Sequence, residues 1–184
     1  YDLNDAIGTV KLMRGVPYGK EITVAAGVDI RFTDIGHLLG SAAIEIFLKE
    51  GDVKRKIVFS GDVGNVNQPI INDPLPIADT DYLVMESTYG NRIHAPAADT
   101  VESLATYIDD TLARGGNVII PSFAVGRTQE LLYAIREIKE RKLSKFPHFP
   151  VYVDSPLAIE ATEIFSKCDI SCFDPETRAL LARG

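Results

Sequence analysis

The sequence predicts a mixed α/β fold in which an antiparallel sheet comes first and an alternation of helices and strands follows. Up to about residue 90, short β-like segments are separated by tight turns such as Ala26-Gly27 and Glu50-Gly51-Asp52. Beyond that point, helical segments alternate with short apolar runs, which is typical of parallel strands joined by right-handed crossovers. We therefore expect two parts of different character within the 184 residues.

The antiparallel part is expected to contain a meander of short strands. Their predicted ranges are 21–25, 28–33, 42–48 and 56–60. In the third strand Ile44, Ile46 and Leu48 alternate with other residues, so they should share one face of the sheet. A single sheet of this kind needs a partner layer to cover its apolar face.

The start of the chain and the segment 65–80 carry weaker signals. Tyr1-Asp2-Leu3 shows no helix cap, and residues 9–14 are compatible with a strand or the end of a short helix. Because the chain begins with neither a cap nor a methionine, we expect it to be cut from something longer. Segment 65–80 holds three prolines and is expected to be an irregular loop.

The sequence pattern of the second half predicts three helices with two strands between them. The first helix opens at Asp99-Thr100 and ends before Gly115-Gly116, the second follows Arg127, and the third runs from Leu157 to about Phe165. The apolar runs 117–121 and 151–153 are typical of buried parallel strands.

Composition excludes several classes of protein. Apolar residues make up 46% of the chain, enough for a substantial core, so the chain is not expected to be disordered. No apolar run approaches the roughly 18 residues of a membrane helix, and no secretory signal is visible. Cys168 and Cys172 are expected to be free thiols, which favours a cytoplasmic location. The net charge of −7 argues against coating nucleic acid by bulk electrostatics, but not against a local grip on its backbone.

Carboxylates appear where two apolar strands end. Asp62 follows the strand residues 57–59, and Glu86 follows the apolar run 82–85. His37 lies in a glycine-flanked loop after another strand. Neutral imidazole and carboxylate groups suit zinc and similar divalent ions, and one carboxylate can bridge two metals. Closing a turn is the simpler alternative role for Asp62.

The start of the second helix is a candidate phosphate site. The loop from Ser122 to Arg127 places backbone N–H groups at a helix N-terminus, where anions bind readily. Arg127 is a candidate phosphate contact, and a salt bridge to Glu130 is an equally good alternative.

Several residues after Glu86 are also candidates. Arg92 and His94 are placed to face a substrate or, alternatively, to be solvated loop residues. Tyr82 and Tyr89 are expected to be packing groups rather than platforms on which bases stack.

Five motifs follow one another along the chain, in the order GHLLGSA, FSGDVG, ESTYGNR, PSFAVGRTQELL and VYVDSPLA. In this order they resemble the β-CASP branch of the metallo-β-lactamase superfamily, in particular relatives of the pre-mRNA cleavage and polyadenylation endonuclease. The resemblance implies part of a metallo-β-lactamase (αββα) domain at residues 1–90 and a partial parallel α/β β-CASP domain at 91–184. It also implies a ribonuclease that uses two zinc ions per active site and acts on single-stranded RNA. Homo-oligomers are expected for a different reason, because a truncated β-sandwich should expose apolar surface that favours self-association.

The resemblance assigns roles to three residues. It implies that His37 binds one metal, that Asp62 bridges both, and that Glu86 supports a histidine acting as general acid. The family's His-x-His-x-Asp-His cluster and its later histidine motifs do not occur in the sequence. We therefore expect an internal fragment that is inactive by itself. The alternative is a non-catalytic β-CASP scaffold subunit that binds RNA or protein partners.

Overall fold

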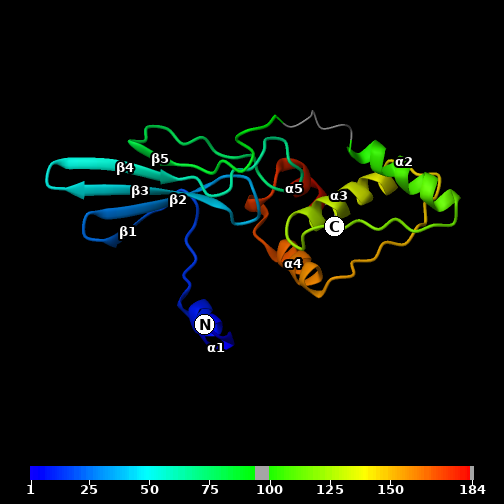
Figure 1. The fold of residues 1–184 in the computed structure, drawn as a ribbon, viewed down its shortest axis with the longest axis horizontal. Coiled ribbons are helices and arrows are strands. Elements are labelled where there is room, and N and C mark those ends of the chain that lie inside the picture. Colours follow the sequence, from blue (N-terminus) through cyan, green and yellow to red (C-terminus); the bar gives the residue numbers. More distant parts are fainter. Residues whose placement is uncertain (94–99, 183–184) are drawn as a thin grey trace. The chain divides into compact units, whose positions relative to one another are not determined.

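A computed structural model of the chain describes residues 1–93 and 100–182. Within these residues it contains one five-stranded sheet and five α-helices, so the predicted mixed α/β class is confirmed (Figure 1). None of the described helices combines the length and the apolar character needed to cross a membrane.

The chain divides into two compact units. Unit 1 comprises residues 1–35, 41–63 and 75–86, and unit 2 comprises residues 36–40, 64–74 and 87–184. The short segments 36–40 and 64–74 therefore pack with the helical second half rather than with the sheet. The predicted domain division at residue 90 stays a prediction.

The sheet of unit 1 has the strand order β1-β2-β3-β4-β5 (Figure 1). The strands are β1 (Glu21–Ala25), β2 (Val28–Asp34), β3 (Ala42–Glu50), β4 (Val53–Phe59) and β5 (Tyr82–Val84). The first four form an antiparallel meander, as predicted, and β5 pairs in parallel with β4. The carboxyl ends of β4 and β5 consequently meet at the same edge of the sheet.

The two faces of β3 differ from what its apolar pattern suggests. Ile44, Ile46 and Leu48 do share a face, as predicted, but all three are only half-buried. Ala43 and Glu45, on the opposite face, are buried. The face that carries a charged side chain is therefore the more buried one.

Glu45 is held in a network of charged and polar groups on that face. Its carboxylate accepts from Arg31 Nε and Nη2, both at 2.8 Å, from Lys56 Nζ at 2.7 Å, and from the Thr33 hydroxyl. The hydrogen bonds from Arg31 lower the pKa of Glu45 to about 2, with Lys56 and Thr33 acting in the same direction against the effect of burial. Arg31 and Lys56 also approach the Phe47 ring, at 5.2 and 5.6 Å from its centroid.

Lys56 also forms hydrogen bonds with the irregular connection between β4 and β5. Its Nζ donates to Ala78 O at 2.6 Å, and its backbone N–H donates to Asp81 Oδ2 at 2.7 Å. As predicted, residues 65–80 contain neither a helix nor a strand. These bonds fix the end of the connection where it enters β5.

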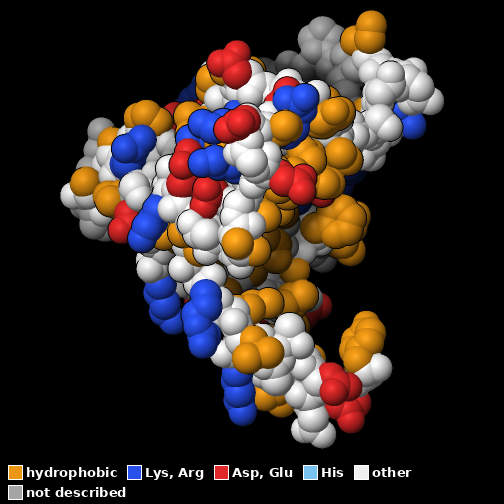
Figure 2. Space-filling model, turned by 90° about the vertical axis from the view of Figure 1, so that its left-hand side faces the viewer, with side chains coloured by type: hydrophobic (Ala, Val, Ile, Leu, Met, Phe, Trp, Pro, Cys, Tyr) orange, Lys and Arg blue, Asp and Glu red, His pale blue; other side chains and the backbone are white. Residues whose placement is uncertain are grey.

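The chain begins with a helix, so of the two alternatives for residues 9–14 the end of a short helix is confirmed. In α1 (Leu3–Leu12), Asp2 accepts hydrogen bonds from Asn4 N and Asp5 N, and the Asp5 carboxylate accepts from Asp2 N at 2.8 Å. The prediction that Tyr1-Asp2-Leu3 contains no helix cap is therefore wrong, because Asp2 and Asp5 form a capping box. No residue of α1 is buried, and its apolar side chains are exposed at the bottom of Figure 2.

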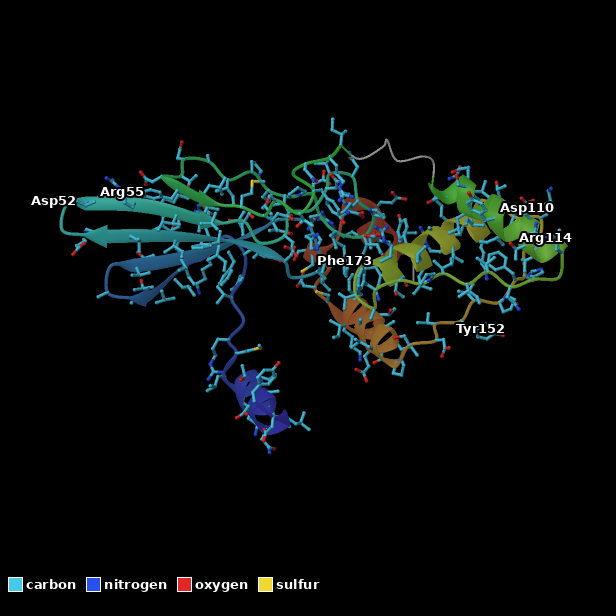
Figure 3. All side chains as sticks on the ribbon, in the orientation of Figure 1. Asp52, Arg55, Asp110, Arg114, Tyr152 and Phe173 are labelled. Atoms are coloured by element: carbon cyan, nitrogen blue, oxygen red, sulfur yellow. The ribbon has the colours of Figure 1, made fainter. Side chains whose placement is uncertain are left out.

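Unit 2 is built from helices. They are α2 (Thr100–Ala113), α3 (Arg127–Glu140), α4 (Pro156–Lys167), a 3₁₀ turn (Ile170–Cys172) and α5 (Pro175–Leu181). The three predicted helices are confirmed. Ala105, Ile108 and Ile138 form the core between α2 and α3, whereas Phe173, labelled in Figure 3, packs with Ile70 and Ile71 in a second cluster.

The two parallel strands predicted for the second half are wrong. Residues 117–121 and 151–153 are extended but belong to no strand, and Ile119 and Tyr152 are 88% and 83% exposed. An apolar run becomes a strand only when a neighbouring chain segment completes its hydrogen-bond ladder. The described part of unit 2 supplies no such neighbour for either run.

Candidate functional site

Asp62 and Glu86 line the same open cleft of unit 1. The cleft lies at the carboxyl ends of β4 and β5 and has a volume of about 390 Å³. Its remaining lining residues are Ala42, Ile44, Phe59, Ser60, Gly61, Val84 and Met85. The parallel pairing of the two strands thus brings together two of the residues predicted to form the site.

Hydrogen bonds tie the two strand ends to each other. The Glu86 carboxylate accepts from the Val63 backbone N–H at 2.6 Å, and the Glu86 backbone N–H donates to the Ser60 hydroxyl at 3.1 Å. Ser60 is buried, and its own N–H donates to Val84 O at 2.9 Å. Because Val63 follows Asp62 directly, the Glu86 side chain restrains the loop that carries Asp62.

Gly61 allows this loop to leave the sheet sharply. It adopts a φ of +59°, and a Cβ at this position would lie 3.1 Å from Ala42 O. A glycine is therefore favoured here on both conformational and steric grounds. Asp62, which follows this turn, is exposed and lines the cleft.

His37 lies in unit 2, in the loop 36–40. Gly36 adopts a φ of +61°, and a Cβ there would lie 2.6 Å from Pro74 N. A Cβ on Gly64 would lie 2.6 Å from His37 N, so the backbone of the histidine loop packs closely against the segment 64–74. His37 is half-buried. Since Asp62 belongs to unit 1, the convergence of His37 and Asp62 stays a prediction.

The donor groups of the site have the right chemistry for a divalent metal but are too few. Carboxylate and imidazole are normal zinc ligands, and a catalytic zinc site needs at least three protein ligands. Within residues 1–93 and 100–182, no group of three or more His, Cys, Asp and Glu side chains is placed to hold one ion. His37 and Asp62 can therefore form only part of a donor set.

The N-terminus of α3 offers fewer free N–H groups than the sequence suggested. Gly126 N donates to the Gln129 side-chain oxygen at 2.7 Å. Arg127 N and Thr128 N donate to carbonyl groups of the preceding loop, at 3.2 and 3.3 Å. The prediction of free backbone donors at this helix start is therefore wrong for these three groups, because the loop and the helix cap each other.

Both side chains proposed as phosphate contacts near α3 have partners within the protein. Arg127 forms a salt bridge with Glu130 at 2.7 Å, which confirms the alternative considered for it, although its side chain remains 64% exposed. The Ser122 hydroxyl lies 2.9 Å from the Thr128 hydroxyl. Arg127 also borders a cleft of about 810 Å³ in unit 2, whose lining contains more acidic than basic side chains. Their role as phosphate contacts stays a prediction.

The tyrosines near Glu86 are more exposed than expected for packing groups. Tyr82 and Tyr89 are 58% and 54% exposed, so about half of each side chain is accessible to solvent. Tyr82 lies on β5, an edge strand that no described residue pairs with on its outer side. The guanidinium carbon of Arg92 lies 5.3 Å from the centroid of the Tyr89 ring. His94 lies outside the described residues.

Two residues that organise the site were missed by the sequence analysis. Ser60 anchors the backbone of Glu86, and its signal was a hydroxyl at a strand end directly before a glycine. Gln129 is buried and bridges the loop before α3 to α4, through Ala124 O and the Thr162 hydroxyl. Its signal was a glutamine three residues after the helix cap, a position from which side chains reach back.

Comparison with known proteins identifies the family. The Beta-Casp domain profile matches residues 128–182. The chain is 34% identical over 183 residues to a ribonuclease of Thermus thermophilus, covering all of this chain and 39% of the relative. It is 35% identical over 168 residues to an RNase J-like protein of Methanocaldococcus jannaschii, covering 89% of this chain and 37% of the relative. It is 33% identical over 168 residues to the endoribonuclease ysh1 of Schizosaccharomyces pombe, covering 90% of this chain and 21% of the relative.

The chain thus spans two fifths or less of the length of these relatives. The matches nevertheless extend over most of its own length and include the strand ends that carry Asp62 and Glu86. Together with the order of its motifs, these similarities show that the chain belongs to the β-CASP family.

Proposed function

We propose that the protein carrying this chain is a zinc-dependent β-CASP ribonuclease that hydrolyses phosphodiester bonds of single-stranded RNA. The observation that carries the proposal is the cleft in which two strand-end carboxylates, Asp62 and Glu86, lie together. Relatives named ribonuclease and endoribonuclease support the same class of reaction. In this proposal residues 1–90 belong to the metallo-β-lactamase domain and residues 91–184 to the β-CASP domain.

In the proposed site His37 and Asp62 would hold zinc, with His37 as a ligand of one ion and the Asp62 carboxylate shared between two. Bound zinc lowers the pKa of a water molecule so that a hydroxide nucleophile is available near neutral pH. The proposal is supported by the packing of Gly64, which follows Asp62 by two residues, against the backbone of the loop that carries His37. The remaining metal ligands come from residues beyond those described.

The chain's own residues orient the reacting groups. The restraint that Glu86 places on Val63 N holds the Asp62 loop in one conformation, which favours a fixed ligand geometry. In the proposal Glu86 also supports the histidine that donates a proton to the leaving oxygen. Arg92, Arg127 and Ser122 contact the RNA backbone. The exposed apolar side chains of both units support homo-oligomer formation as a further part of the proposal.

The experiment is to measure cleavage of a labelled single-stranded RNA by the ribonuclease that contains this chain, with Asp62 replaced. Asp62→Asn keeps the shape of the side chain but removes the charge that a bridging ligand needs, so turnover should fall by at least about 100-fold. The matched control is Asp52→Asn, at the hairpin tip labelled in Figure 3, which should leave turnover unchanged. Normal cleavage by Asp62→Asn with metal present would show that the role assigned to Asp62 is wrong.

A non-catalytic scaffold subunit is the second candidate. The observation that favours it is that the described residues contain no complete set of metal ligands. The two candidates differ in metal content. An enzyme should retain about two zinc ions per molecule after dialysis, whereas a scaffold that lacks the site should retain none.

A further inference from the structure

Tyr89 and Arg92 form a stacked pair on the surface of unit 2. The guanidinium carbon lies 5.3 Å from the ring centroid, a distance at which a cation is attracted to the face of an aromatic ring. Both side chains are exposed, and Tyr89 keeps 54% of its surface accessible. The pair therefore presents an aromatic surface and a planar cation side by side to solvent.

Arg92 differs from every other cation that lies over a ring in the described part of the chain. In the other four pairs the cation also binds an oxygen of the protein: Arg31 and Lys56 bind Glu45, Arg136 binds Glu140, and Lys139 binds Phe149 O. Within residues 1–93 and 100–182, the Arg92 side chain has no hydrogen bond or ion pair. Stacking on the Tyr89 ring thus holds the Arg92 guanidinium group in place. No acceptor in the described part of the chain binds any of its five N–H donors.

The backbone fixes the spacing of the pair. Gly90 N donates to Ser87 O at 3.0 Å, and Arg92 N donates to Tyr89 O at 3.1 Å, so two successive turns connect the residues. A Cβ on Gly90 would lie 3.3 Å from Ser87 O, which leaves little room for a side chain inside the turn. A ligand that binds the pair therefore does not need to order this segment first.

We propose that Tyr89 and Arg92 bind an unpaired RNA nucleotide, with the base stacked on the pair and its phosphate bound by the Arg92 guanidinium. Aromatic rings and guanidinium planes accept single-stranded bases by stacking, and the guanidinium fork matches the oxygens of a phosphate. The inference rests on the proposed function, since it names a subsite for the RNA of that reaction. A duplex does not fit this chemistry, because its bases are stacked on each other and cannot reach the ring.

The experiment measures fluorescence anisotropy of two labelled probes titrated with the 184-residue chain. One probe is an oligoadenylate of about 10 nucleotides, and the other is an abasic ribose-phosphate strand of the same length and charge. If a base stacks on Tyr89, the oligoadenylate should bind about 5- to 150-fold more tightly than the abasic strand. Equal affinities for the two probes would overturn the inference. This comparison requires no substitution in the protein.

Substitutions assign the effect to the pair. Tyr89→Leu should abolish most of the preference for the oligoadenylate and leave the affinity for the abasic strand within about twofold, while Tyr89→Phe should keep the preference. The matched control is Tyr107→Leu, because Tyr107 is also exposed but lies on α2 with no cation over its ring in the described structure. Arg92→Gln should reduce the slope of log K against log salt concentration by about 0.7, as expected for the loss of one phosphate contact.

The outcomes separate this inference from the proposed function. If both probes bind with equal affinity and the ribonuclease still requires Asp62, the proposed function stands and the stacking subsite is overturned. If neither probe binds, both the subsite and the RNA contacts proposed for this chain are overturned. If Tyr89→Leu alters only the self-association of the chain, measured by light scattering, the pair is a protein contact and the inference is wrong.

Discussion

The carboxylate of Glu86 accepts a hydrogen bond from the backbone N–H of Val63 at 2.6 Å. This bond joins the end of β5 to the residue that follows Asp62, and it spans 23 positions of sequence. The carboxyl ends of the parallel strands β4 and β5 are therefore coupled. A displacement of either strand end should move both carboxylates of the cleft, Asp62 and Glu86.

The Glu86 hydrogen bond predicts different effects for two substitutions. Glu86→Ala removes the acceptor and should lower the free energy of unfolding by about 1 kcal/mol, whereas Glu86→Gln keeps an acceptor oxygen and should change it by less than about 0.5 kcal/mol. Urea denaturation followed by circular dichroism measures both values. Glu50→Ala, at an exposed position at the end of β3, is the control and should have little effect.

The same pair of variants separates the structural role of Glu86 from its proposed chemical role. If the protein that carries this chain cleaves RNA as proposed, both substitutions should reduce turnover by about 100-fold or more, because neither replacement carries the negative charge. Full turnover by Glu86→Gln would mean that Glu86 only holds the loop.

The stability of unit 1 should depend on pH through Glu45. Its pKa is about 2 in the folded chain, below its ordinary value of 4.5, so its hydrogen bonds stabilise the folded state above about pH 4.5. This stabilisation should be lost as the pH falls from 4.5 toward 2, and its size is of the order of 3 kcal/mol. Denaturation by urea at a series of pH values between 6 and 2 measures the loss.

Glu45→Gln is the control for this pH dependence. The amide does not titrate, so the variant should be less stable than the wild type at pH 6 and should show a flatter profile below pH 4.5. A profile in the variant as steep as that of the wild type would assign the effect to other carboxylates.

A side chain at Gly126 is predicted to destabilise the chain. It adopts φ +83° and ψ −78°, and Arg127 N donates to Val125 O across it, so it is the centre of a tight γ-turn. A Cβ would also collide with Leu38 Cδ2. Gly126→Ala should therefore destabilise the chain by about 1–3 kcal/mol, measured as a shift in the urea midpoint.

Two comparisons divide this cost between conformation and collision. Gly115→Ala introduces a side chain at a φ of +71° into open space, so it should show the cost of a positive φ without a collision. Leu38→Ala should reduce the additional cost of Gly126→Ala in a double-mutant cycle. If the two substitutions were additive, the contact with Leu38 would have no energetic effect.

Gln129 should be needed to hold α3 and α4 together. Gln129→Met removes a side chain that binds Gly126 N and the Thr162 hydroxyl, and it leaves both partners without this bond in a buried environment. The expected loss is about 1–3 kcal/mol. Thr162→Val removes the bond from Gln129 and the bond that the Thr162 hydroxyl donates to Ala158 O, but it leaves the contacts of Gln129 with Gly126 N and Ala124 O intact. It should therefore cost less than Gln129→Met. An equal loss in the two variants would show that the contacts with Gly126 N and Ala124 O are together worth no more than the bond from Thr162 to Ala158 O.

The sequence predicted the elements whose stabilising contacts are local or between neighbours in the chain. The strands of the meander and the helices α2, α3 and α4 were found because apolar period, turns and caps lie within a few residues of each other. The runs 117–121 and 151–153 carry the same apolar signal as a buried strand, but a strand also needs a neighbour, and a single sequence does not reveal whether one is present.

The candidate site was predictable in its residues and not in its contacts. Asp62 and Glu86 were found because carboxylates directly after apolar strands stand out in the sequence. Their joint cleft depended on the parallel pairing of β4 and β5, which the sequence did not specify. Burial of Glu45 was also missed, because its partners Arg31 and Lys56 come from the two neighbouring strands and depend on register. The start of helix α1 was missed because Asp2 and Asp5 were not recognised as a capping box.

The proposed function requires His37 and Asp62 to bind the same metal ion. The test is a crystal structure of the full-length protein that carries this chain, grown with zinc, with anomalous diffraction recorded at the zinc edge. A zinc peak is expected about 2.0–2.2 Å from both a His37 ring nitrogen and an Asp62 carboxylate oxygen. Zinc bound elsewhere, with His37 and Asp62 contacting no ion, would contradict it.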